Sequence, residues 1–183
     1  MGPDIPAGIR PPMIRNLFRN VDFDNSEEVD LDALDAKLAS CLAYWRGLGA
    51  GNGLPAWKDV DMVALPSDVL PLVTVVDIDW RHGTGDADAL SYRFWGTGHV
   101  RAKNIERTGT RVSEHSNRTP VVEAEYLKVI ERKQPMAFRK NILIENPMRA
   151  VLQTSVRLPL SNDGVRVDNI LSASVWDDLK TPG

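Results

Sequence analysis

Cysteine is almost absent from this chain, and its scarcity excludes several classes of protein at once. Cys41 is the single cysteine among 183 residues, so neither an internal disulfide nor a multi-cysteine metal centre is available. Basic residues are also in deficit, because 22 Lys and Arg face 25 Asp and Glu. A net charge of −3 gives no broad basic surface for DNA or RNA. We therefore expect a protein of the reducing cytoplasm that does not bind nucleic acid.

Long apolar runs are missing as well. The longest of them, residues 69–76, is interrupted by Pro71 and Thr74 and falls far short of the roughly 20 residues that span a bilayer. The opening segment, MGPDIPAGIRPPMIR, contains prolines and an acid where a secretory signal has an apolar core. We expect no membrane association. A content of 43% hydrophobic and 26% charged residues is typical of an ordinary globular domain.

The chain divides into four segments by composition. Asn25 and Glu28 form a capping-box pattern, and leucines then recur at helical spacing until a series of glycines begins at Gly47. This pattern predicts an amphipathic helix. The predicted segments are an irregular N-terminal arm (1–24), the amphipathic helix with its glycine-rich stop (25–53), a globular domain (54–178) and a C-terminal tail (179–183).

Apolar and β-branched runs separated by turn residues predict five strands within the globular domain. Thr119-Pro120 is typical of a helix start, and Pro135 of a stop soon after the helix. Asn, Asp and Gly at 162–164 favour a tight antiparallel hairpin, because these residues tolerate positive φ. The predicted strands are 72–79, 90–95, 136–144, 151–160 and 165–176, and the predicted helix is 120–133.

Simple alternation along 90–95 divides this strand into two faces. Leu90, Tyr92 and Phe94 are expected on one face. Ser91, Arg93 and Trp95 are expected on the other, and periodicity leaves open which face lines a pocket. Runs of antiparallel strands separated by a helical block indicate an α+β domain.

Several short motifs resemble a known family when they are taken in order. They are YWRGLG at 44–49, LPAWKDVD at 54–61, YRFWGTG at 92–98, RTGTRVSE at 107–114 and LPLSNDGVRVDNIL at 158–171. Together they resemble the PAS domain superfamily, and within it a small stand-alone bacterial family originally of unknown function. The resemblance implies a five-stranded antiparallel sheet with helices on one face, and a pocket between them. It also implies a role in sensing or in regulating signalling partners, usually kinases.

The stretch from Ser91 to Glu114 carries the candidate site. Its glycines do not form a phosphate loop, because Gly-Lys-Ser/Thr is missing and Arg101 stands where a dinucleotide motif needs glycine. In a PAS-like fold the exit from this strand borders the pocket. An inward Arg93 would favour an anionic ligand. The residues expected to line the ligand site are Arg93, Phe94, Gly96, Thr97, His99, Tyr126 and Ile130.

The resemblance also bears on cofactors. Haem-binding PAS domains use a histidine on the helix before the third strand, and the helix expected at 120–133 contains none. Flavin-type photoreceptor domains carry a reactive cysteine in an Asn-Cys-Arg motif, whereas Cys41 lies on the N-terminal helix and is interpreted as packing. Neither haem nor flavin is supported, and the ligand stays unidentified. We expect no metal site, because alternation gives only Asp77 and Asp79 a common face beside His82.

Three functions are consistent with these patterns. The first is a non-catalytic sensory or regulatory domain that binds a small molecule, a signalling protein such as a kinase, or both. The second is a ligand-free dimeric interaction module that docks its partner through the helix at 26–48. The third is a small enzyme that uses His99 and a carboxylate in an α+β pocket. A homodimer is expected, because the apolar stripe of the N-terminal helix must cover something.

Overall fold

One antiparallel sheet organises the chain. The computed structural model describes residues 18, 20–49, 53–82, 87–116, 120–145 and 147–179. The strands, in the spatial order β1-β4-β5-β6-β2-β3, are β1 (Glu27–Val29), β2 (Thr74–Ile78), β3 (Leu90–Trp95), β4 (Met136–Glu145), β5 (Met148–Leu160) and β6 (Asn169–Asp178). The α-helices are α2 (Ala36–Leu48), α3 (Thr97–Lys103), α4 (Val112–Ser116) and α5 (Val121–Arg132). Short 3-10 turns are η1 (Leu31–Ala33), η2 (Trp57–Asp59), η3 (Met62–Ala64), η4 (Leu70–Leu72), η5 (Trp80–His82) and η6 (Ala87–Ala89).

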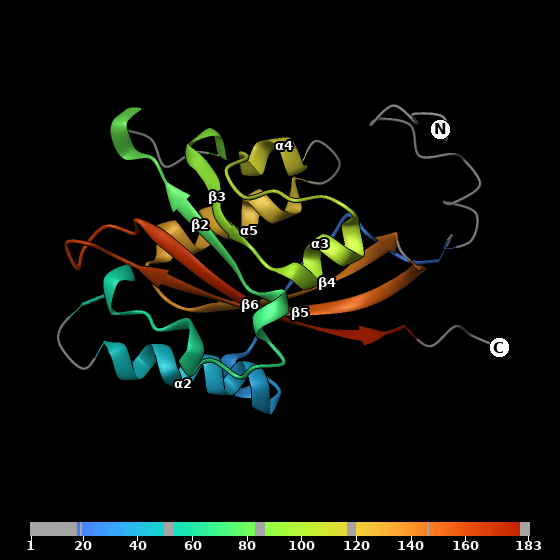
Figure 1. Cartoon of the computed structure of the whole chain (residues 1–183), viewed down its shortest axis with the longest axis horizontal. Helices are drawn as coiled ribbons and strands as arrows, with labels where there is room; N and C mark the ends of the chain where they lie inside the picture. Colours follow the sequence, from blue (N-terminus) through green and yellow to red (C-terminus); the bar gives the residue numbers. More distant parts are fainter. Residues whose placement is uncertain are drawn as a thin grey trace.

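Helices cover both faces of this sheet. Figure 1 shows α2 on one side, and α3, α4 and α5 on the other. The α+β class is confirmed, because one antiparallel sheet packs against separate helices. The expectation of five strands is wrong, because the short β1 adds a sixth strand beside β4. The N-terminal helix, which was expected in addition to the helices on one face, is α2, and it packs on the opposite face.

The face under α2 is apolar. Leu38, Cys41 and Leu42 are buried in one cluster with strand residues that include Val156 and Leu158. The indole Nε1 of Trp45, on the same helix, donates to the Pro159 carbonyl at 2.8 Å. The apolar stripe that motivated the dimer prediction is therefore covered by the chain's own sheet.

Helix α2 begins later than the sequence pattern predicts. Residues 27–29 pair with β4 as a strand, and the helix starts after Asp35, whose side chain accepts from the Leu38 amide at 2.8 Å. The capping box at Asn25 and Glu28 is thus wrong, because pairing to β4 and the cap at Asp35 compete successfully with it. The predicted end is confirmed, since the helix stops at Leu48 with Gly49 as its C-cap.

A β-bulge changes which side chains of β3 face inward. The pairing of β2 with β3 shifts between Val75 and Val76, so that Val75 lies opposite Phe94 whereas Val76 lies opposite Tyr92. One extra residue in a strand breaks the period of two. Trp95 consequently turns inward with Tyr92, and Phe94 turns outward, with 39% of its surface exposed. The alternation predicted for this strand holds through Arg93 and is wrong for Phe94 and Trp95.

The remaining elements follow the sequence closely. The predicted strands and the long helix are all present, and the turn before β6 contains Gly164 at a φ of 78°. Some predictions lie outside the described residues: the arm before residue 18, the turn residues 83–86, the Thr119 cap and the tail from 180 onward. Within the described ranges, no helix is long and apolar enough to cross a bilayer.

Candidate functional site

The two buried faces of the sheet differ sharply in chemistry. Along β5, Val156 and Leu158 point toward α2, whereas Ser155 and Arg157 point toward α3 and α5. We call the second surface the polar face, and it consists of the strand residues Thr74, Lys140, Gln153, Ser155, Arg157, Ser172 and Ser174. Buried polar groups lower stability unless each finds a partner. A core made only for stability would resemble the apolar face, so the polar face is the candidate site.

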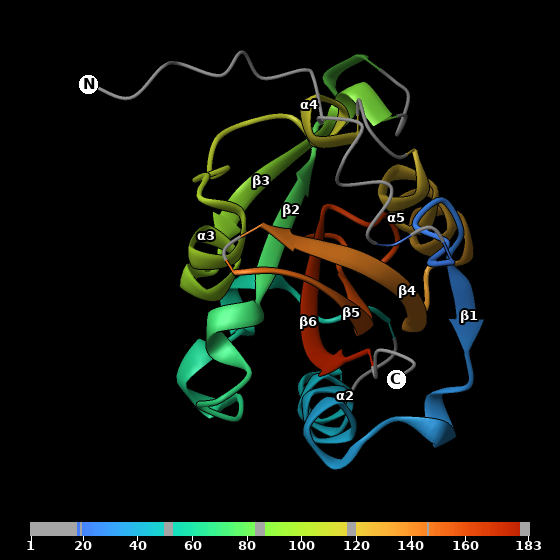
Figure 2. The same cartoon turned by 90° about the vertical axis from the view of Figure 1, so that its right-hand side faces the viewer.

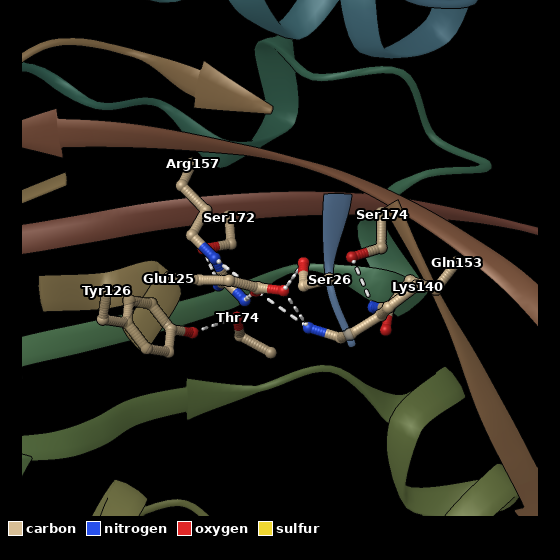
Figure 3. A network of polar contacts seen from close by, with 9 residues as sticks. All are labelled: Ser26, Thr74, Glu125, Tyr126, Lys140, Gln153, Arg157, Ser172 and Ser174. Atoms are coloured by element: carbon tan, nitrogen blue, oxygen red, sulfur yellow. Dashed lines mark hydrogen bonds and ion pairs between the residues drawn. The ribbon is translucent and has the colours of Figure 1, made fainter. Parts of the chain in front are cut away.

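Glu125 on α5 is the centre of this site (Figure 3). Its side chain is 2% exposed, and Lys140 Nζ donates to its two carboxylate oxygens at 2.7 and 2.8 Å. The Arg157 guanidinium donates to Oε2 through Nη2 and, at 3.1 Å, through Nε. Ser26 Oγ, from the segment before β1, donates to Oε1 at 2.6 Å. One carboxylate therefore ties together α5, β4, β5 and the N-terminal segment.

The charges in this cluster do not cancel, because two basic side chains face one carboxylate. Burial alone would raise the pKa of Glu125, but attraction to Arg157 and Lys140 outweighs burial and lowers that pKa to about 2. Burial lowers the pKa of Lys140 to about 8, and attraction to Glu125 only partly offsets it. Two buried cations thus share one carboxylate at neutral pH.

Secondary contacts hold the cluster in place. Arg157 Nη1 donates to Ser172 Oγ at 3.0 Å, and its guanidinium carbon lies 4.0 Å from the centre of the Tyr126 ring. Gln153 Nε2 donates to Ser174 Oγ at 3.0 Å. The hydroxyls of Tyr126 and Thr74 are 3.5 Å apart. These bonds connect three strands to α5 (Figure 3).

His99 lies in an aromatic environment at the other end of the polar face. Its ring centre is 4.7 Å from that of Trp95 and 5.4 Å from that of Trp176. Its Nε2 is 3.2 Å from the Leu72 carbonyl oxygen, which fits a neutral ring that donates from Nε2. Burial lowers the pKa of His99 to about 4. The described contacts thus hold a neutral, packed imidazole, and they pair it with a carbonyl instead of the carboxylate that the enzyme hypothesis needs.

The predicted site residues separate into two groups in the structure. His99 and Tyr126 are buried at the polar face, and Ile130 packs beside the same core. Arg93, by contrast, is exposed on β3, where its Nε donates to Asp77 Oδ1 at 2.7 Å. Phe94 beside it is exposed as described above.

The two residues at the end of β3 have structural surroundings. Thr97 is exposed at the start of α3. Gly96 is buried, and a Cβ there would come within 2.3 Å of the Pro71 carbonyl oxygen. Glycine is therefore required for the close approach of two backbone segments.

Side chains fill the space between the polar face and its helices. Tyr92, Trp95 and Tyr126 are almost completely buried in one cluster with Phe138 and Val129. Hollows of about 350 and 220 Å³ lie elsewhere, next to the N-terminal segment and the edge of β4. In the described part of the chain, the pocket expected beside Gly96 is thus a packed interior.

Sequence reasoning missed Glu125, Lys140 and Arg157. A signal was present, because Glu125 occupies a position in the apolar stripe of α5 between Val122 and Val129. Lys140 and Arg157 likewise interrupt strands that are otherwise largely apolar. Charged residues at core positions in separate elements indicate a buried ion cluster, although their pairing follows only from the fold.

Comparison with known proteins yields limited information. No family model matches the chain, and no curated protein does. A solved structure described as an RNA-binding light-oxygen-voltage receptor is similar over 85% of this chain, with 10% sequence identity and a TM-score of 0.45. The chain spans 39% of that receptor's chain. The RNA binding in its description is a property of that receptor.

Proposed function

We propose that this chain is a non-catalytic, PAS-like regulatory domain of the small stand-alone bacterial type, which acts by contact with a signalling protein such as a kinase. The observation that carries the proposal is the filled interior between the sheet and α3 to α5. Ligand sites are concave and largely pre-formed. Here the corresponding space is occupied by Tyr92, Trp95, His99 and Tyr126 from the chain itself. A domain of this kind offers its surface, and not its interior, to the molecule that it regulates.

The buried ion cluster supports this interpretation. Glu125 joins α5 to β4 and β5, so a contact that moves α5 changes three elements together. Such a cluster gives the packed domain a defined geometry, which a regulatory contact requires. Homodimerisation stays a prediction. The apolar stripe on α2 that motivated it is covered within the chain.

A direct test uses the sensor kinases of the source cell. The purified chain is added to each purified kinase, and the rate of autophosphorylation is measured. At least one kinase should change its rate about fivefold or more, as expected for a typical coupling between a regulator and its target. Unchanged rates across the whole set would refute the proposal.

A second candidate is small-molecule sensing at the polar face. Ser155 Oγ and Trp176 Nε1 are buried and have no hydrogen-bond partner among the described residues. Buried donors without partners are uncommon, and a bound acceptor would satisfy them. A thermal-shift screen of small anions and polar metabolites tests this candidate. A compound that raises the Tm of the wild-type chain but not of Ser155→Val would favour sensing, whereas an unresponsive wild type would remove it.

A further inference from the structure

The N-terminal strand β1 is held at the edge of the sheet by few interactions. It pairs with β4 over three residues, Glu27 opposite Arg139, Glu28 opposite Phe138 and Val29 opposite Ala137. On its other side, β4 pairs with β5 along its full length, from Met136 to Glu145. Figure 2 shows β1 at the outer edge, beside α5 and β4. This short strand is therefore the most weakly attached part of the sheet.

Packing around β1 is also incomplete. Glu27 and Glu28 are exposed, and Val29 is half-buried. The hollow of about 350 Å³ lies between the segment from Glu28 to Asp32 and the segment from Gln134 to Ala137. The hollow of about 220 Å³ lies at the other end of β1, where Ser26 and Glu27 meet Arg139 and Lys140. Because open volume lies on both sides of β1, the strand loses fewer van der Waals contacts when it leaves the sheet.

We call the surface of β4 and α5 that β1 covers the seat. The seat is basic, whereas β1 itself is acidic. Glu28 Oε1 accepts from Arg132 Nη1 at 2.8 Å, and Glu27 lies opposite Arg139. The Nε of Arg139 is buried and has no hydrogen-bond partner among the described residues. Ser26, two residues before Glu28, supplies the hydroxyl that reaches Glu125. The seat thus selects an extended acidic segment with a hydroxyl, an acid two residues later and an apolar residue after it.

We propose that β1 occupies, within its own chain, a docking site for an extended acidic segment of the signalling partner. The partner's segment adds to the edge of β4 as a strand, in the pattern Ser-x-Glu-Val that β1 itself shows at 26–29. Strand addition of this kind supplies affinity through main-chain hydrogen bonds and specificity through alternate side chains. β1 is then a competitor that the partner displaces.

Displacement reaches α5 through two contacts. Arg132 and Glu125 both belong to α5, and they bind Glu28 and Ser26 respectively. When β1 leaves, both contacts are lost unless the incoming segment restores them. The inference rests on the proposed function, because it names the surface and the class of partner through which that function operates.

The test uses a fluorescein-labelled synthetic peptide of residues 22–31, DFDNSEEVDL, and fluorescence polarisation with the full chain. In the variant Ser26→Ala/Glu28→Arg, β1 loses both tethers, and the peptide should bind about tenfold more tightly than to the wild type because the seat is open more often. The matched control Ser40→Ala/Asp59→Arg makes the same chemical changes at exposed positions and should behave as wild type. A peptide carrying the two β1 substitutions should lose its affinity for the variant.

A second measurement, hydrogen exchange on the wild type, tests the docking site even if the double variant does not fold. In the wild type, those amides of β4 at 137–139 that face β1 should exchange hydrogen faster than those of β5, and excess unlabelled peptide should slow them. Equal affinity for wild type and variant, or unchanged exchange with peptide, would overturn the docking site. A disulfide between chains in a mixture of the Val29→Cys and Ala137→Cys variants would overturn it in favour of strand exchange between two copies. Peptide binding without any kinase response would leave the docking site standing and remove the proposed function.

Discussion

His99 makes the stability of this domain sensitive to mild acid, and the size of the effect follows from its burial. Its pKa is about 4 in the folded chain, below the ordinary histidine value of 6.5, because burial disfavours the imidazolium. Between these two values the unfolded chain binds the proton and the folded chain does not, so stability falls as pH falls. Lowering the pH from 7 to 4.5 should cost about 2 kcal/mol through this residue alone. Glu125 loses most of its contribution between pH 4.5, its pKa in the unfolded chain, and about 2, its pKa in the folded chain, so it contributes little above pH 4.5.

Urea unfolding of the wild type and of His99→Phe, at pH values from 7 to 4.5, isolates this effect. Phenylalanine retains a ring between Trp95 and Trp176 but cannot take up a proton. The two chains share all other titrating groups, so the difference between their free energies of unfolding reports His99. We expect the wild type to lose about 2 kcal/mol more than the variant over this range. A difference that stays constant with pH would show that His99 is protonated or exposed in the folded chain.

Three further predictions concern Glu125, Gly96 and Cys41 in the interior, and the first two have exposed controls. Glu125→Gln leaves two buried cations without a counter-charge and should lower the free energy of unfolding by about 3–5 kcal/mol. Glu131→Gln, at an exposed position of the same helix, should change it by less than about 0.5 kcal/mol. Equal effects of the two substitutions in urea unfolding would contradict the buried ion cluster. Gly96→Ala should lower the free energy of unfolding by about 3 kcal/mol, because the added Cβ meets two backbone carbonyl oxygens. In Gly47→Ala the added Cβ meets nothing within 4 Å, and the change should stabilise α2 by about 0.5–1 kcal/mol. Thermal melts that reverse this order would refute the close approach at Gly96. Burial raises the pKa of Cys41 to about 11, so its thiol should react with a thiol reagent at pH 8 only after unfolding. Fast labelling of the folded chain would contradict the role of Cys41 in packing. Cys41→Ser should leave regulation of the target intact.

Local signals carry most of the strands. Apolar runs bounded by Gly, Pro and Asn predict β2 to β6, because each run is long enough to be buried on at least one face. The 162–164 turn is predictable for the same reason, since its residues favour positive φ. These features depend on neighbours in sequence, and a single sequence contains that information.

Features that depend on distant pairing were not predictable. β1 is three residues long and mostly exposed, and its partner lies more than a hundred residues away, so no alternation marks it. The bulge in β3 is a property of its pairing with β2, and it alone decides that Trp95, and not Phe94, joins the interior. The site was affected most, because its central bonds join Glu125 to two strands and to Ser26.

Native mass spectrometry of the full chain, purified from the source organism under gentle conditions, tests the central claim most directly. The central claim is that the chain's own side chains fill the interior between the polar face and α3 to α5. We therefore expect the mass of the protein alone, for the wild type and for Ser155→Val. An additional small mass that is retained by the wild type and lost from Ser155→Val would contradict it and would assign the polar face to a ligand.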